Sequence, residues 1–271
     1  MRTNFRAMPD MQSGLQRIQA SHRLPSPELE RRQRIEIEFW RDSRTERPES
    51  DAVENIVNKA ADAAIFLELV DRFRDVFVRA RTILEIGAGQ GWASCLVKRL
   101  FPSAEVTASD ISQYAVASVD KWERIYETRL DGVHVCRSYE LNEPDSSVDL
   151  VFCFAAAHHF VAHRRTLAEI ARVLVPGGHA LYLYEPSCRA YLHAFARRRV
   201  NGNRPDVPED VLVYDRIVRI ARGLGLGCEL DFFPSTKRRG PIETLYYAAL
   251  QRLSPLQRLL PCTINYHFRK P

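Results

Sequence analysis

The sequence predicts an α/β fold in which a mostly parallel sheet of seven strands is covered by helices on both faces. Between residues 82 and 188, short apolar runs alternate with segments of helical periodicity. This alternation is typical of parallel sheets, because each strand is followed by a helix that crosses back over the sheet. The first apolar run leads into a turn with three alternate glycines, which is expected where a ligand approaches the backbone closely.

Each element follows from its local pattern. Five apolar runs predict the parallel strands, over residues 82–86, 106–109, 133–136, 148–155 and 180–184. Apolar residues at helical spacing predict the helices between them, over residues 92–100, 112–127 and 166–174. Prolines at 102 and 176 end the first and the third of these helices, and two glycines at 177–178 form the next turn.

The two ends of the chain follow other patterns. Residues 1–27 are polar and lack periodicity, which is typical of a flexible arm. Two helical patterns follow, over residues 28–43 and 53–79, and Asp51 is the expected N-cap of the second helix. After residue 187 the alternation loosens. We expect helices over residues 191–199, 209–224 and 242–259, and strands over residues 228–233 and 263–268.

Composition limits the class of protein. The chain has 271 residues, of which 45% are hydrophobic and 27% charged, as in globular proteins with a full core. It has no apolar run long enough to span a membrane and no apolar leader near residue 1. Its six cysteines are scattered, which favours reduced thiols in a cytoplasmic protein.

The net charge of +5 is unevenly distributed. Residues 189–271 contain 15 Lys and Arg against 7 Asp and Glu. Such an excess could attract a carboxylate, a phosphate or an acidic carrier protein. It could equally be the solvated charge of surface helices and loops.

The turn after the first strand carries the most informative motif, Glu85-x-Gly87-x-Gly89-x-Gly91. A dinucleotide site would have its third glycine one residue later, where this chain has Trp92. A P-loop would end in Gly-Lys-Ser/Thr, which is absent. The motif instead resembles the first motif of the class I S-adenosylmethionine (SAM) dependent methyltransferases, and in particular their bacterial small-molecule branch.

The resemblance extends over about residues 83–186, where residues 167–178 resemble the motif that precedes the fifth strand in this branch. It implies a Rossmann-like fold with an N-terminal helical extension and helical lid insertions, and a last strand that runs antiparallel. We therefore divide the chain into a tail and helical arm (residues 1–50), a SAM-binding core (51–187), and a lid insertion with the last two strands of the same domain (188–271).

The same resemblance implies SAM as cofactor and S-adenosylhomocysteine as product. Glu85 would hold the methionyl ammonium, and the glycines would wrap the methionine part and the ribose. Asp110, at the end of the second strand, would accept both ribose hydroxyls, although it could instead cap the next helix. The residues expected to bind the cofactor are Glu85, Gly87, Ala88, Gly89, Gly91, Asp110, Ile111, Ser138, Tyr139 and Phe154.

The adenine region departs from the family pattern. The family often carries an acid between the third and the fourth strand, but this chain has Arg137, Ser138 and Tyr139 at the aligned positions. The backbone of Ser138 and the ring of Tyr139 could hold the adenine. Glu140 could serve if the loop is shifted by one residue.

The reacting groups should follow strands four and five, because ligands of open α/β sheets bind outside the carboxyl ends of the strands. The loops there carry His158, His159 and Glu185. A neutral oxygen nucleophile needs a base, and histidine titrates in the right range. We expect His159 or His158 as the base, unless the histidine is structural, and Glu185 as a further base or substrate anchor. His159 and His163 could share a helix face as metal ligands, but without a third ligand nearby we expect no metal.

These observations predict an enzyme that transfers a methyl group from SAM to a small molecule, such as a metabolite of natural-product biosynthesis. The acceptor atom is expected to be oxygen, with nitrogen and carbon left open, and the acceptor could be anionic or carrier-bound. The alternatives are a protein that binds SAM without transferring its methyl group, and a dehydrogenase. The nucleic-acid amino-methylating signature, Asp/Asn-Pro-Pro-Tyr/Phe, is absent, so we expect no nucleic-acid partner. The oligomeric state is left as monomer or homodimer.

Overall fold

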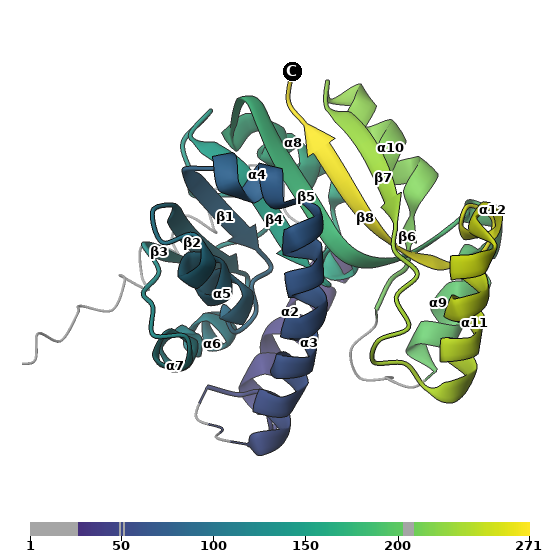
Figure 1. Ribbon diagram of the computed structural model, residues 1–271. Helices are drawn as coiled ribbons and strands as arrows, with labels where there is room; N and C mark the ends of the chain where they lie inside the picture. Colours follow the sequence, from purple (N-terminus) through teal and green to yellow (C-terminus); the bar gives the residue numbers. More distant parts are fainter. Residues whose placement is uncertain (1–26, 49, 51, 203–208) are drawn as a thin grey trace, which may run out of the picture.

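The computed structural model describes residues 27–48, 50, 52–202 and 209–271 (Figure 1). The flexible arm predicted over residues 1–27 lies, except for its last residue, outside the described residues. The expected helix cap Asp51 also lies outside them.

The described chain is organised around one mixed sheet with the strand order β3-β2-β1-β4-β5-β8-β7. The first five strands in this order are parallel, and β8 runs antiparallel to both of its neighbours. The strands are β1 (Thr82–Ile86), β2 (Glu105–Asp110), β3 (Gly132–Val135), β4 (Val148–Phe154), β5 (Leu174–Cys188), β7 (Gly227–Phe232) and β8 (Cys262–Arg269). The predicted fold class, including the antiparallel last strand, is confirmed.

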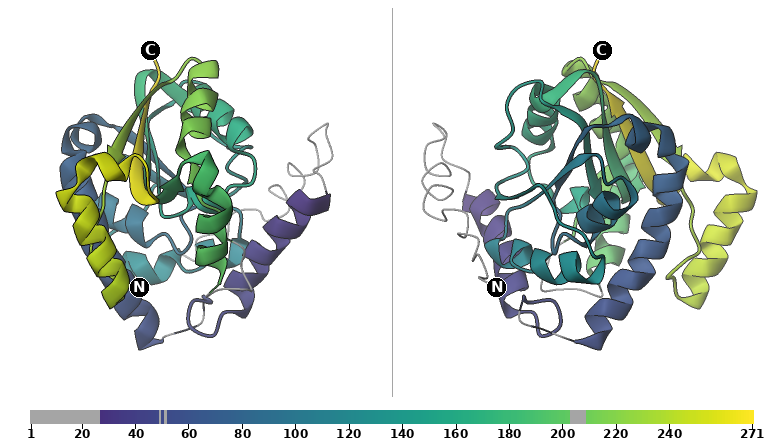
Figure 2. Two further views of the ribbon diagram at one scale, coloured as in Figure 1. Left: turned by 90° about the vertical axis from the view of Figure 1, so that its right-hand side faces the viewer. Right: turned by 60° about the vertical axis from the view of Figure 1, so that its left-hand side comes forward.

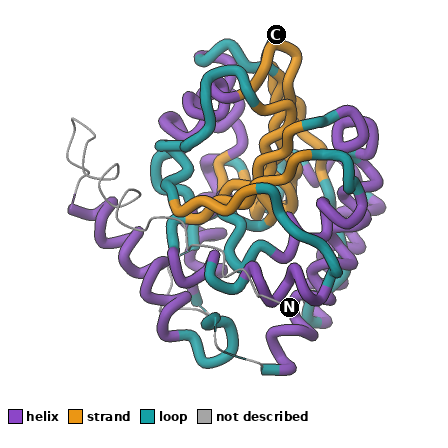
Figure 3. Tube along the Cα trace, turned by 90° about the vertical axis from the view of Figure 1, so that its left-hand side faces the viewer, coloured by secondary structure: helices purple, strands orange, loops and turns teal. Residues whose placement is uncertain are grey.

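Helices cover both faces of the sheet, and Figure 3 shows the strands between them. Successive strand residues point to opposite faces, so Ile83 packs into one hydrophobic core and Leu84 into the other. The first core contains side chains of α3 (Val53–Arg72), α4 (Arg74–Arg79), α5 (Trp92–Leu100) and α7 (Val119–Ile125). The second contains side chains of α8 (His163–Val173) and α10 (Tyr214–Gly223).

The remaining helices lie beyond the carboxyl ends of the parallel strands. Figure 2 shows α2 and α11 projecting from the sheet on opposite sides. These helices are α2 (Pro27–Asp42), α6 (Gln113–Val116), α9 (His193–Asn201), α11 (Pro241–Arg252) and α12 (Ser254–Gln257). Because parallel strands present their ligands at this edge, these helices surround the place where a site is expected.

Several boundaries differ from the prediction. The helix predicted over 53–79 is interrupted at Phe73, and the one predicted over 112–127 is divided into α6 and α7. The helix predicted over 242–259 breaks before Pro255, which cannot continue a helix from the preceding turn. The helix predicted from residue 209 begins only at Tyr214, because the two preceding residues form β6 (Leu212–Val213) against the end of β5.

Strand β5 is much longer than the predicted segment 180–184, and it contains a bulge. Its pairing with β8 shifts register between Tyr182 and Glu185. Within the bulge, Tyr184 has a φ of +61°, a left-handed conformation that bulky residues rarely adopt. The amide N–H of Tyr184 donates to Oδ1 of Asn265 on β8 at 2.8 Å. The bulge therefore changes the direction of β5 near the carboxyl ends of the parallel strands.

Two tyrosines of the second core provide a matched test of buried hydroxyl groups. Tyr182 Oη has no hydrogen-bond partner in the described part of the chain, whereas Tyr266 Oη lies 2.8 Å from Ser187 Oγ. We expect Tyr182→Phe to raise the free energy of unfolding by about 1 kcal/mol, since a buried hydroxyl without a partner is unfavourable. Tyr266→Phe should lower it by about 1 kcal/mol. Urea unfolding checks both, and a loss of stability in Tyr182→Phe would contradict the assignment.

Candidate active site

A cavity of about 900 Å³ lies at the carboxyl edge of the parallel strands. Residues from the strand ends line its floor, and residues of α2, α3, α9 and α11 line its sides. Most of the predicted site residues meet here. They are Glu85, Gly87, Ala88, Gly89, Asp110, Ile111, Ser138, Tyr139, Phe154, His158 and His159. Gly91 and Glu185, by contrast, are not among the residues that line the cavity.

Gly87 and Gly91 of the glycine turn are each required by a different steric constraint. Gly87 has a φ of +67°, and a Cβ there would lie 3.0 Å from both Ala156 Cβ and a carbon of the Phe160 ring. Gly91 has a φ of +76°, and its Cβ would lie 2.7 Å from Val119 Cγ2 on α7. The structure thus places Gly87 at the cavity and Gly91 in the packing of α5 against α7.

Glu85, the penultimate residue of β1, is a buried carboxylate without a cationic partner among the described residues. Its Oε2 accepts hydrogen bonds from the amide N–H of Ser94, at 2.9 Å, and from the Ser94 hydroxyl. Burial raises the pKa of Glu85 to about 8, although the bonds from Ser94 oppose this shift. A cationic group placed beside Glu85 would favour its charged form, so the site fits an ammonium group.

Asp110 is oriented by two backbone amides. Its Oδ2 accepts from Gly89 N–H and its Oδ1 from Ser112 N–H, each at 2.8 Å. Burial raises its pKa above the usual range, and these amide bonds oppose the shift. The hydroxyl of Ser112 caps the following helix by accepting from Ala115 N–H. The capping role considered for Asp110 thus belongs to Ser112, and the remaining lone pairs of Asp110 can accept from a diol.

At the expected adenine region, Ser138 and Tyr139 line the cavity and Glu140 does not. Glu140 instead forms ion pairs with Arg137, at 2.9 Å, and with Arg165, at 3.4 Å. Tyr139 Oη accepts a hydrogen bond from the side chain of Gln33 on α2 at 2.7 Å. The alternative with a shifted loop is therefore disfavoured, because Glu140 is occupied by arginines outside the cavity.

Helix α2 supplies residues that the sequence analysis missed. Gln33, Glu36 and Trp40 line the cavity, and a Cβ on Gly89 would lie 3.1 Å from the Trp40 ring. Burial, followed by the charge of Asp110, raises the pKa of Glu36 to about 7. The helical period of residues 28–43 predicts the helix, but no local pattern indicates which element it covers.

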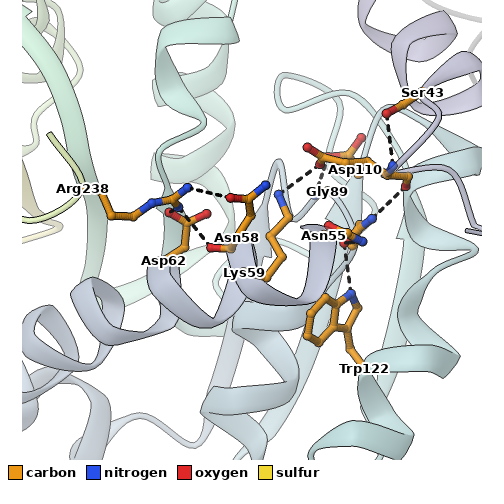
Figure 4. A network of polar contacts seen from close by, with 11 residues as sticks. Ser43, Asn55, Asn58, Lys59, Asp62, Gly89, Asp110, Trp122 and Arg238 are labelled. Carbon is orange, nitrogen blue, oxygen red and sulfur yellow. Dashed lines mark hydrogen bonds and ion pairs between the residues drawn. The ribbon is translucent and has the colours of Figure 1, made fainter. Parts of the chain in front are cut away.

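A polar network attaches α3 and the loop that precedes it to the glycine turn (Figure 4). The Gln90 side chain donates to the Glu46 carbonyl at 2.7 Å and accepts from Asn55 and Trp122 at 3.2 Å each. Lys59 forms an ion pair with the Glu46 carboxylate at 3.0 Å. These contacts position Glu46 and α3 against the glycine turn.

The buried carboxylate of Glu185 organises the loop after β4. Its Oε1 accepts from the amides of Ala156 and Ala157 at 2.9 and 2.8 Å. Its Oε2 accepts from the amide of His158 at 3.1 Å and lies 2.9 Å from His158 Nδ1. Burial lowers the pKa of His158, but the hydrogen bond and charge of Glu185 outweigh it, so the pKa lies above its usual value of 6.5.

His159 belongs to a different cluster from the one predicted. A ring nitrogen of His158, one of His159 and a carboxylate oxygen of Glu209 lie within 4.8 Å of one another, and this set could hold a metal ion. His159 Nδ1 also lies 3.4 Å from Glu36 Oε2. The considered partner His163 is not in this set, and burial lowers its pKa to about 4.

The fold is the Rossmann-like fold of the class I SAM-dependent methyltransferases. A family model described as "Methyltransferase domain" matches residues 84–182. The chain is similar to the phthiotriol/phenolphthiotriol dimycocerosates methyltransferase of Mycobacterium tuberculosis, with 33% identity over 104 residues. The match covers 38% of this chain and 37% of that enzyme. The resemblance suggested by the glycine motif is confirmed.

Two further similarities extend this comparison. The malonyl-[acyl-carrier protein] O-methyltransferase of Hahella chejuensis is 34% identical over 100 residues, which cover 35% of this chain and 33% of that enzyme. A crystal structure of geranyl diphosphate C-methyltransferase from Streptomyces coelicolor, in complex with Mg2+, geranyl-S-thiolodiphosphate and S-adenosyl-L-homocysteine, superposes with a TM-score of 0.57 and 12% identity. It covers 75% of this chain and 76% of that one. Among the residues that the structure describes, none of the helices combines the length and the hydrophobicity of a membrane-spanning segment.

Replacing Glu185 should measure how much its hydrogen bonds stabilise the fold. We expect Glu185→Gln to lower the free energy of unfolding by about 3 kcal/mol, because the amide places donors opposite buried N–H groups and leaves some without an acceptor. Glu229→Gln is the control, since that side chain is 88% exposed and should change stability by less than about 0.5 kcal/mol. Urea unfolding distinguishes the two, and equal stabilities would contradict the structural role of Glu185.

Proposed function

We propose that this protein transfers a methyl group from SAM to an oxygen atom of a small-molecule acceptor. The observation that supports this most directly is that one cavity joins a cofactor half, with Glu85 and Asp110, to a histidine bonded to a buried carboxylate. The chain spans little more than a third of the matched mycobacterial enzyme, so the acceptor is argued from this cavity alone.

The cofactor half fits SAM in charge and in hydrogen bonding. Glu85 would pair with the ammonium group, and Asp110 would accept the ribose hydroxyls. Ser138, Tyr139 and Ile111 would surround the adenine, and Phe154 would lie toward the acceptor half. Bound SAM supplies a methyl group on a cationic sulfur, which is already an activated leaving group.

His158 is proposed as the base. With the Nδ1–H bonded to Glu185, the Nε2 of a neutral His158 carries the lone pair, and it would accept the proton that the acceptor hydroxyl loses. Glu185 would act as a positioning residue, because it fixes the tautomer and the ring orientation without lining the cavity. His159, which the sequence analysis favoured, is the second candidate, with Glu36 rather than Glu185 as its neighbour.

The cofactor assignment is tested by calorimetric titration with SAM, S-adenosylhomocysteine and NAD. We expect micromolar binding of the two sulfur ligands and none of NAD. Asp110→Ala should weaken SAM binding at least about tenfold, since both ribose hydroxyls lose their acceptor. Asp120→Ala on the exposed face of α7 is the control and should bind SAM as the wild type does. Unchanged affinity in Asp110→Ala would reject the ribose role.

The base assignment predicts a pH dependence. His158 must be neutral to accept a proton, and its pKa is raised above 6.5. Turnover should therefore fall as the pH decreases through the pKa of His158. With an acceptor identified by screening with methyl-labelled SAM, His158→Gln should lower turnover about 100-fold or more and retain SAM affinity. His159→Gln should have a much smaller effect.

Three results would revise this proposal. A large loss in His159→Gln with little change in His158→Gln would move the base to His159. The methyl transfer is also proposed to be metal-independent, so that EDTA should leave turnover unchanged. Loss of turnover in EDTA, restored by a divalent ion, would instead assign His158, His159 and Glu209 as metal ligands. SAM binding without labelled product from any acceptor would favour the alternative of a SAM-binding protein.

A cytoplasmic location is also proposed. All six cysteines are free thiols and five are buried, as is common in a reducing compartment.

A further inference from the structure

The half of the cavity away from the glycine turn contains a guanidinium group with an unusual environment. Arg239 lies in the loop before α11 and lines the cavity together with Tyr184, Tyr247 and Thr263. Its side chain is only 14% exposed. None of these four residues has been given a role in binding SAM or in proton transfer.

Neutral groups hold Arg239 in place. Its Nε donates to the Ser235 carbonyl at 2.7 Å, and its Nη2 donates to Thr263 Oγ1 at 2.9 Å and to Tyr184 Oη at 3.4 Å. The guanidinium stacks on the Tyr247 ring, 3.4 Å from its centroid. Three side chains and one carbonyl therefore fix the orientation of the guanidinium plane.

The charge of Arg239 is not matched by a close carboxylate. Among the described residues its one ion pair is with Glu243, whose Oε2 lies 3.9 Å from Nη1, beyond hydrogen-bond distance. Glu243 also pairs with Arg199 at 3.4 Å. The neighbouring Arg238, by contrast, bonds directly to Asp62 on α3 (Figure 4). A mostly buried cation without a close counterion is unfavourable, so an anion bound in the cavity would stabilise this arrangement.

The bulge in β5 connects this arginine to the reaction centre. Tyr184 has a φ of +61°, and its ring stacks on Phe154 with 5.7 Å between centroids and 12° between planes. Its hydroxyl reaches Arg239. Strained backbone of this kind occurs mainly at functional sites. Phe154, Tyr184 and Arg239 thus form a continuous wall from the cofactor half to the guanidinium.

We propose that Arg239 binds a carboxylate of the methyl acceptor, with Tyr184 and Tyr247 shaping its pocket. The hydrogen bonds found among the described residues engage Nε and Nη2, which leaves the Nη1 donors for the ligand, and a planar guanidinium matches a carboxylate. Two of the three other arginines that line the cavity, Arg199 and Arg238, pair with acids. A single guanidinium whose nearest carboxylate lies beyond hydrogen-bond distance fits a monoanion better than a phosphate dianion.

Apolar side chains line the cavity as well. They are Leu192, Val200, Val211, Leu260 and Phe195 of α9, and 64% of the Phe195 surface is exposed. The proposed substrate class is therefore an acceptor with a carboxylate and an apolar chain. This inference rests on the proposed function only in calling the ligand the acceptor, because the carboxylate site itself is independent of SAM.

The site is tested without SAM and without turnover. Saturation-transfer NMR titrations with hexanoate and with hexanamide compare two probes of the same shape that differ in charge. We expect hexanoate to bind at least tenfold more tightly than hexanamide. Arg239→Gln should weaken hexanoate binding at least tenfold and leave hexanamide binding unchanged. Arg238→Gln, in the same loop, is the matched control and should bind both probes as the wild type does.

Equal affinities of the two probes in the wild type, or an unchanged hexanoate affinity in Arg239→Gln, would overturn the proposal. Tighter binding of inorganic phosphate than of hexanoate would also overturn it, in favour of a phosphate site. If Arg239→Gln does not fold, Arg239→Lys gives the test, since it keeps the charge but loses the planar group and should still weaken hexanoate binding. Calorimetry with SAM separates the proposed SAM site from the proposed carboxylate site. Asp110→Ala should lose SAM affinity and retain hexanoate binding, and Arg239→Gln should retain SAM affinity and lose hexanoate binding.

Discussion

The arrangement of the site depends on one buried carboxylate. Glu185 comes from β5 but accepts hydrogen bonds from three successive amides of the loop that follows β4. A charged group out of contact with water is unfavourable unless its hydrogen bonds are satisfied, so the loop must close around it. That closure places His158 at the cavity and leaves Glu185 behind the wall. Two parallel strands are thereby joined at their functional edge by a side chain rather than by backbone pairing alone.

A second constraint comes from the number of acids at this edge. Glu85, Asp110 and Glu36 all have raised pKa values, with burial as the largest cause for each. Acids that approach one another in a cavity resist ionisation, and a bound cation relieves this cost. The cofactor half is thus suited to a positively charged ligand. The opposite half, with Arg239, is suited to a negatively charged one, so the cavity has a polarity along its length.

Much of the fold could be predicted because its signals are local. Each parallel strand is a short apolar run, and the first begins and ends at the predicted residues, Thr82 and Ile86. The extension of β5 was missed because its ends pair with β6 and β8, which are distant in sequence. The break in the helix predicted over 242–259 had a local signal in Pro255, whereas the interruption at Phe73 had none that we recognise.

In the candidate site, likewise, the residues at the strand ends could be predicted from local sequence signals, and those from distant segments could not. Glu85 and Asp110 lie at the carboxyl ends of β1 and β2, and their position is fixed by the sheet. Glu36, Glu209 and Arg239 reach the cavity from α2, the segment before β6 and the loop before α11, and only tertiary packing brings them there. The choice between His158 and His159 depended on Glu185, which is 27 residues from His158 in sequence.

The bulge in β5 has a consequence for how this sequence can change over time. Glycine at position 184 would relieve the left-handed backbone of a cost of about 1–2 kcal/mol. Backbone strain alone would therefore favour glycine or asparagine there, and the packing of the Tyr184 ring against Phe154 and Phe233 opposes that change. A tyrosine is retained only if its ring and hydroxyl confer an advantage that exceeds this cost. Among proteins that share this bulge, the residue at this position should therefore vary with the acceptor rather than with the thermal stability of the fold.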